Sequence, residues 1–172
     1  HSLGGALANL TAATFARRVE ESTGAEKDLM DSILHSIKVQ TFGQPRIGDK
    51  DFQEWYNDIC CLGKNTLRHV NSNDLIPRIP PRDPIIWFRF FDPDWIHVGF
   101  QWHYNRKGKV DKITHNRDVS DLFFGNIPNP IALTNSVIDH MPWRYLWLAE
   151  GLSPNTPNMK RRLEEAKYVS LF

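Results

Sequence analysis

The sequence predicts an α/β fold in which helices connect the parallel strands of one sheet. Helix-like and strand-like segments alternate between residues 3 and 70, in the order helix, strand, helix, strand. Parallel neighbours need a crossover connection, and a helix is the usual one. A hairpin pattern further along the chain adds two more strands. With 172 residues, of which 41% are hydrophobic, the chain has enough apolar material for one domain core.

The first predicted helix runs from Leu3 to about Ser22, and Thr23 and Gly24 end it. Its apolar residues recur at helical spacing, and its first half is rich in glycine and alanine. Small side chains of this kind allow a helix to approach a sheet closely. An ordinary alanine-rich amphipathic helix explains this feature equally well.

Two strands and a second helix follow. Ser36–Phe42 is β-branched, alternates in polarity and stops at Gly43, which predicts a strand. Asp49 is predicted to cap the next helix. The core-facing side of that helix is expected to carry four apolar residues: Phe52, Trp55, Tyr56 and Ile59. Thr66–Val70 is the second predicted strand.

The rest of the chain predicts a hairpin and a short helix. Phe100–Tyr104 and Val110–Thr114 are joined by a turn that contains Gly108. Pro142 in a first helical turn predicts a helix that ends at Gly151. The aromatic window Ile85–Phe91 suits the wall of an acyl pocket, although a buried strand is the favoured interpretation.

Composition excludes several classes of protein. A net charge of +1 favours neither nucleic acid nor an acidic partner. No apolar run approaches the roughly 18 residues of a membrane span, so we expect no transmembrane segment in this chain and at most peripheral contact with lipid. The histidines lack metal-site spacing, and we expect neither a metal nor a cofactor. The adjacent Cys60 and Cys61 exclude a loop-closing bridge between them, which weakly favours an intracellular compartment.

The start of the chain, His1-Ser2-Leu3-Gly4-Gly5, matches the second half of a nucleophile elbow. An elbow of the form G-x-S-x-G holds its serine on a sharp turn from strand to helix, where small residues avoid crowding. The leading glycine and the strand would precede residue 1. We therefore expect a serine hydrolase, of which this chain is the C-terminal portion.

A nucleophilic serine needs an imidazole to accept its proton and a carboxylate to orient that imidazole. Asp74 follows the second predicted strand and precedes the stiff proline-containing segment Leu75–Pro81. His140 lies at a predicted junction between a loop and a helix. The order Ser, Asp, His is that of the α/β-hydrolase fold.

Alternatives exist for both partners. Asp74 could bond to its own backbone in an Asx turn. His97, His103 and His115 also follow Asp74, but His140 is favoured over them. Asp139 is a poorer orienting acid because adjacent side chains diverge.

Five segments match one known family in order: His1–Ala6, Thr41–Gly48, Arg68–Pro81, His97–Gly99 and Val137–His140. On these motifs the chain resembles the class 3 lipases, the fungal triacylglycerol lipase-like family of α/β-hydrolases, from His1 to about Gly151. The resemblance implies an incomplete α/β-hydrolase fold. Its first strands, its lid and the strand before the elbow are expected to lie before residue 1. Residues 100–102 depart from the family, since many relatives are expected to carry an acidic residue there, and we assign them packing alone.

The resemblance also implies roles for individual residues. Ser2 is expected to be the nucleophile, Asp74 the orienting carboxylate and His140 the general base, then acid. The backbone N–H of Leu3 is expected to be one oxyanion donor, with the second donor before residue 1.

The function expected of the parent protein is hydrolysis of the carboxylic esters of acylglycerol lipids. Residues 1–151 are expected to be the C-terminal part of the catalytic domain. Residues 152–172 are expected to be a linker and a charged helix. The alternative is a truncated, inactive lipase-like domain that acts as a lipid-associating or interaction module.

Overall fold

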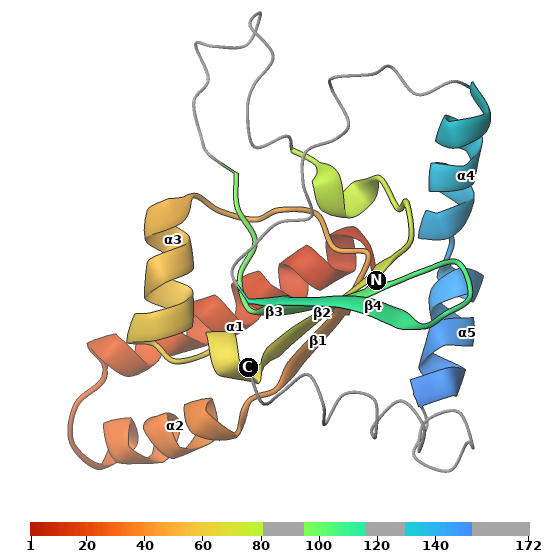
Figure 1. Cartoon of the computed structure of the whole chain (residues 1–172). Coiled ribbons are helices and arrows are strands. Elements are labelled where there is room, and N and C mark those ends of the chain that lie inside the picture. Colours follow the sequence, from red (N-terminus) through yellow and green to blue (C-terminus); the bar gives the residue numbers. More distant parts are fainter. Residues whose placement is uncertain (81–94, 116–129, 153–172) are drawn as a thin grey trace, which may run out of the picture.

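A mixed four-stranded sheet forms the centre of the molecule (Figure 1). The computed structural model describes residues 1–80, 95–115 and 130–152, except for the side chains of 111–115, 130–133 and 151–152. The strands lie in chain order across the sheet: β1 (Val39–Phe42), β2 (Thr66–Asn71), β3 (Phe100–Tyr104) and β4 (Val110–His115). β1, β2 and β3 are parallel, and β4 is antiparallel to β3. The predicted α/β class and the predicted hairpin are both confirmed.

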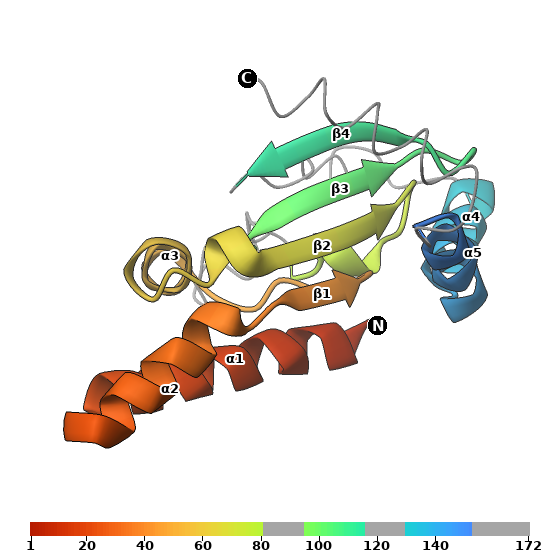
Figure 2. The same ribbon diagram turned by 90° about the horizontal axis from the view of Figure 1, so that it is seen from below.

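The helices lie at the side and at both ends of this sheet (Figure 2). Their bounds are α1 (Leu3–Glu21), α2 (Gly24–Ser36), α3 (Lys50–Glu54), α4 (Pro130–His140) and α5 (Pro142–Leu152). Figure 2 shows α1 beside β1, and α4 and α5 at the end towards which β1, β2 and β3 point. The N-terminus lies at that same end (Figure 2). Two short 3-10 turns, Gly63–Asn65 and Ile76–Arg78, flank β2.

The main core lies between α1, β1 and the segment after β1. Its buried apolar side chains come from several elements: Ala12, Ala13, Ala16, Val19, Leu34, Val39, Tyr56, Leu62 and Val98. Gly5 explains the close approach of α1, since a Cβ there would lie 3.1 Å from Cβ of Thr41 and 3.0 Å from Cβ of Gln44. The small residues of the first helical turns therefore allow the helix to pack directly on the sheet.

The helix after β1 differs from its prediction in one respect. Asp49 caps α3 as expected, accepting the backbone N–H of Phe52 at 2.8 Å. The helix then continues as a π-helical turn over Trp55–Ile59. This turn rotates later side chains relative to α-helical spacing. Tyr56 is fully buried, but Ile59 is 69% exposed, so its predicted burial is wrong.

Two further boundaries differ from prediction. Helix α2 extends to Ser36, so the strand predicted to start there begins at Val39. No helix was predicted over Gly24–Ser36, although Leu29, Met30, Ile33 and Leu34 recur there at helical spacing; of the residues of α2, Leu34 is buried. The segment before His140 is helical, so His140 ends α4 where a loop was predicted. Pro142 begins α5, and a proline disfavours helical geometry in the residue before it, here Met141.

The predicted segment Ile85–Phe91 lies outside the described residues. So does the predicted linker and charged helix of residues 152–172, apart from Leu152, which ends α5. No helix in the described ranges combines the length and apolar character of a bilayer span.

Candidate active site

Ser2 stands at the turn that leads into α1. Its backbone has φ 58° and ψ −135°, a conformation that non-glycine residues rarely adopt. The N–H of Ser2 donates to the carbonyl of Phe42 at 2.9 Å, which ties the turn to the end of β1. Backbone strain of this kind costs about 1–3 kcal/mol and persists where the surrounding structure holds it. The Ser2 hydroxyl is thereby held at the carboxyl end of the parallel strands.

Asp74 follows β2 and is fully buried. Its N–H donates to the carbonyl of Asn71 at 2.9 Å, and its Oδ1 accepts the N–H of Ile76 at 2.8 Å. The second bond is the local Asx-type contact considered from sequence. It coexists with a contact to a distant histidine, so the two interpretations of Asp74 do not exclude each other.

His140 lies between the other two side chains. Its Nδ1 lies 2.9 Å from Asp74 Oδ2 and 3.0 Å from Oδ1, and its Nε2 lies 2.9 Å from Ser2 Oγ. A carboxylate accepts hydrogen bonds, which assigns the proton of the neutral imidazole to Nδ1. Nε2 is then the ring nitrogen available to accept the proton of the serine. The structure thus brings the three predicted side chains into one hydrogen-bonded chain.

Leu3 is the first residue of α1, directly after Ser2. The first four N–H groups of a helix have no carbonyl partner within that helix. The backbone N–H of Leu3 therefore lies at the N-terminus of α1, which carries a partial positive charge, beside the serine hydroxyl.

Tyr145 and Gly43 complete the surroundings of Asp74. The Tyr145 hydroxyl donates to Asp74 Oδ2 at 2.5 Å and accepts the N–H of Asn71 at 3.0 Å. Burial raises the pKa of Tyr145 well above its usual value of 10.0, and the charge of Asp74 adds to this effect. Gly43 has φ +59°, and a Cβ there would lie 2.7 Å from Asp74 Oδ2 and 3.0 Å from the Tyr145 hydroxyl.

Asp139, the neighbour of His140, contacts the end of β2. Its carbonyl accepts the side-chain amide of Asn71 at 2.8 Å, and its Oδ2 accepts the N–H of Asn73 at 3.2 Å. These two bonds attach the last turn of α4 to the segment that carries Asp74. Asp139 thus joins the two segments, whereas Asp74 contacts the imidazole.

The other described histidines have different partners. Nε2 of His97 pairs with the carbonyl of Pro77 at 2.7 Å, and burial lowers the pKa of His97 well below 6.5. Nε2 of His103 pairs with the carbonyl of Ser72 at 2.8 Å. Neither of these nitrogens contacts Ser2. The side chain of His115 lies outside the described residues.

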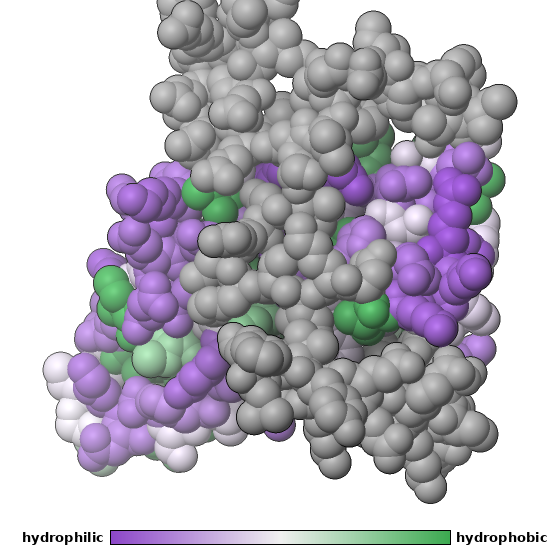
Figure 3. Space-filling view, in the orientation of Figure 1, coloured by the Kyte–Doolittle hydropathy of each residue, from purple (hydrophilic) through white to green (hydrophobic). Residues whose placement is uncertain are grey.

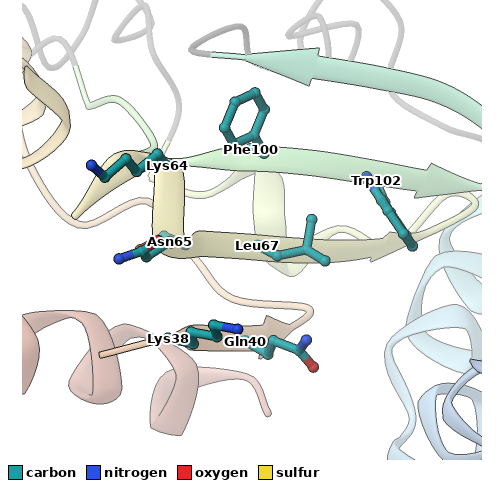
Figure 4. A pocket seen from close by; sticks show the side chains of 8 residues that line it. Lys38, Gln40, Lys64, Asn65, Leu67, Phe100 and Trp102 are labelled. Carbon is teal, nitrogen blue, oxygen red and sulfur yellow. The ribbon is translucent and has the colours of Figure 1, made fainter. Parts of the chain in front are cut away.

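A groove of about 290 Å³ lies on the sheet face opposite α1, near the amino ends of the strands (Figure 4). It is lined by Lys38, Gln40, Lys64, Asn65, Thr66, Leu67, Phe100 and Trp102. Ser2, Asp74 and His140 are not among these residues, so the groove is separate from their hydrogen-bonded chain. No group of side chains in the described ranges is arranged to hold a metal ion.

Comparisons with known proteins show the family of the chain. Residues 1–83 match the family model described as lipase (class 3). The chain belongs to the class 3 lipase family. It is 31% identical to a lipase of Rhizomucor miehei over 144 residues, covering 83% of this chain and 32% of that protein. It is 30% identical to triacylglycerol lipase OBL1 of Ricinus communis over 151 residues, covering 86% of this chain and 24% of that protein.

The chain thus spans about a third and a quarter of the lengths of these two relatives. Among solved structures, it aligns with lipase II from Rhizopus niveus at a TM-score of 0.49 and 23% identity. That alignment covers 81% of this chain and 43% of the other. The family and the observed sheet together show that this class 3 lipase chain has an incomplete α/β-hydrolase fold.

The family match includes Ser2 and Asp74 and ends before His140. Sequence reasoning missed Tyr145 and the contact role of Gly43 in this class 3 lipase chain. The sequence offered one signal for Tyr145: it is an aromatic residue with a hydroxyl, about one helical turn after Met141. That signal is weak, because aromatic residues fill core positions in many helices.

Proposed function

We propose that the protein is a serine-dependent carboxylic ester hydrolase that acts on acylglycerol lipids, with Ser2, Asp74 and His140 as its catalytic triad. The observation that carries the proposal is the continuous hydrogen-bonded chain from Ser2 Oγ through both ring nitrogens of His140 to Asp74. The same three residue types perform acyl transfer on several unrelated folds. Residues 1–151 are proposed to be part of a lipase catalytic domain.

Ser2 Oγ attacks the ester carbonyl while His140 Nε2 accepts the serine proton. The resulting imidazolium keeps its Nδ1 proton on Asp74, whose negative charge stabilises it. The carbonyl oxygen gains the negative charge and accepts the N–H of Leu3. One such donor is typically worth about 2.7–4 kcal/mol in the transition state.

The tetrahedral intermediate collapses when His140 gives its proton to the leaving alcohol, which leaves an acyl group on Ser2. Water then attacks the acyl-enzyme as His140 removes a proton from it. The carboxylic acid is released, and the serine recovers its proton.

Exposed apolar side chains support an apolar acyl substrate. Large apolar residues are exposed on α1 and α4, which begin or end beside Ser2 and His140, and on the adjoining α5: Leu3, Val137, Ile138, Trp143, Leu146 and Trp147. The face in Figure 3 is mostly polar over the described residues, with apolar residues in small patches. The family relationship to a triacylglycerol lipase favours glycerol esters over other acyl compounds.

The test compares Ser2→Ala with Ser36→Ala in the complete gene product. Both changes remove a hydroxyl, but Ser36 ends α2 and donates to the carbonyl of Ile33, away from the proposed triad. Rates are measured on short- and long-chain p-nitrophenyl esters and on emulsified triacylglycerol. We expect Ser2→Ala to lower kcat by at least about 1,000-fold and Ser36→Ala to leave it unchanged.

Two outcomes would count against the proposal. Hydrolysis that survives Ser2→Ala would refute the nucleophile. A wild-type protein that binds lipid vesicles but hydrolyses none of the esters would favour the alternative, an inactive lipid-associating module.

A further inference from the structure

The carboxylate of Asp74 is held by more than its contact with His140. Both of its oxygens lie within 3.0 Å of His140 Nδ1, so both are directed at the imidazole. Oδ1 also accepts the N–H of Ile76 at 2.8 Å, and Oδ2 also accepts the hydroxyl of Tyr145 at 2.5 Å. One external donor on each oxygen prevents rotation of the carboxylate about χ2.

We propose that Tyr145 is the positioning residue that fixes the Asp74 carboxylate against His140, an inference that rests on the proposed function. The Tyr145 hydroxyl is a donor and an acceptor at once. It accepts the N–H of Asn71 at 3.0 Å, which directs its own proton away from Asn71 and towards Asp74 Oδ2. Because the partners of its hydroxyl are Asp74 and the backbone of Asn71, Tyr145 acts through Asp74.

The position of the tyrosine ring is set by the residues packed around it. Tyr145 is 3% exposed and belongs to a small core cluster with Tyr104 and Leu148, against which Phe42 packs. Its ring meets that of Phe42 edge-on, with centroids 5.9 Å apart. Gly43 leaves the space that the hydroxyl and the carboxylate share, since any Cβ there would meet both. The Tyr145 hydroxyl thus occupies a space so tight that one methyl group at position 43 would collide with it. This tight placement favours a positioning role for Tyr145 over general packing.

The topology explains why a residue on α5 can hold an aspartate that follows β2. Asp139 bonds the last turn of α4 to Asn71 and Asn73, which docks the α4–α5 corner on the end of β2. Tyr145 lies on the next helix and contacts the same strand end through the N–H of Asn71. The imidazole of His140, at the end of α4, and the hydroxyl of Tyr145, on α5, thus both reach the Asp74 carboxylate from the α4–α5 corner. Their relative geometry depends on the corner at Met141 and Pro142.

The first variant is Tyr145→Phe, which keeps the ring and removes the hydroxyl. Hydrogen bonds to charged groups are among the stronger ones in proteins, and we expect kcat to fall about tenfold with KM within twofold. The matched control is Tyr56→Phe, which removes a fully buried hydroxyl that pairs with Asn9 and Thr66. It should lower stability and leave kcat unchanged.

A double-mutant cycle with Asp74→Asn separates positioning from packing. An asparagine at position 74 presents an amide in place of one carboxylate oxygen, so the tyrosine hydroxyl has lost the group through which it acts. We expect Tyr145→Phe to reduce kcat about tenfold in the wild-type background and less than twofold in the Asp74→Asn background. Equal reductions in both backgrounds would show a packing role and overturn the inference.

The outcomes also distinguish this inference from the proposed function. Both are rejected if Ser2→Ala retains the wild-type rate. The positioning role alone is rejected if Ser2→Ala abolishes hydrolysis while Tyr145→Phe has wild-type kcat. Covalent labelling of Ser2 by a fluorophosphonate gives a second readout. Its rate should fall in Tyr145→Phe by the same factor as kcat, whereas an unchanged labelling rate would contradict the positioning role.

Discussion

Replacing Gly43 by alanine tests how tightly the surroundings of Asp74 are packed. Gly43 has φ +59°, and alanine in the left-handed region costs about 1–2 kcal/mol. The new Cβ would also lie 2.7 Å from Asp74 Oδ2 and 3.0 Å from the Tyr145 ring and hydroxyl. Forcing extra atoms into a packed site adds about 1–3 kcal/mol. The free energy of unfolding should therefore fall by about 2–5 kcal/mol.

The same collision should reduce activity. Relief of a 2.7 Å contact requires the carboxylate or the tyrosine to move by several tenths of an ångström, and both hold the geometry of His140. Displacements approaching 1 Å at such a site can lower rates about 100-fold. We expect kcat on a p-nitrophenyl ester to fall between tenfold and 100-fold in Gly43→Ala.

Gly24→Ala is the matched control for this experiment. Gly24 has φ +62°, close to that of Gly43, but a Cβ there would meet nothing within 4 Å. It should show the conformational cost of about 1–2 kcal/mol alone, with wild-type kcat. Urea unfolding and ester hydrolysis are measured on both variants. If Gly43→Ala matches Gly24→Ala in both measurements, the reasoning about the packed carboxylate is wrong.

Two further predictions concern stability. Burial lowers the pKa of His69 from 6.5 to about 4, so the unfolded chain takes up a proton first as the pH falls. Urea unfolding should show full stability above pH 6.5 and a loss of about 3 kcal/mol by pH 4, to which the buried His97 adds; a flat profile would contradict this sign. Asp49→Ala removes the cap of α3 and should lower the unfolding free energy by about 1 kcal/mol without changing kcat. Asp49→Asn, which keeps an acceptor, should recover most of that loss.

Local patterns predicted much of the fold and failed at identifiable places. The α1 bounds, the strand β2 and the hairpin follow from periodicity and turn residues, which act over a few neighbours. Ile59 was misplaced because a π-helical turn, which local spacing does not reveal, rotates it into solvent. Helix α2 was missed although Leu29, Met30, Ile33 and Leu34 recur at helical spacing, so the sequence held a local signal for it.

The candidate site shows the same division. Ser2 was predictable because an elbow has a local signature, and Asp74 because it follows a strand and precedes a stiff loop. Tyr145 was not predictable, since its importance comes from one hydroxyl contact with a residue 71 positions away.

By itself, the sequence determined the alternation of helices and strands, the turn at Ser2 and the order of the three candidate catalytic residues. These features arise from backbone preferences and side-chain periods within short segments. Only the tertiary structure decided that His140 meets Ser2 and Asp74, across separations of 138 and 66 residues, and that Tyr145 holds the same carboxylate. The physical reason is that parallel strands bring their carboxyl ends to one edge of the sheet, where the α4–α5 corner docks.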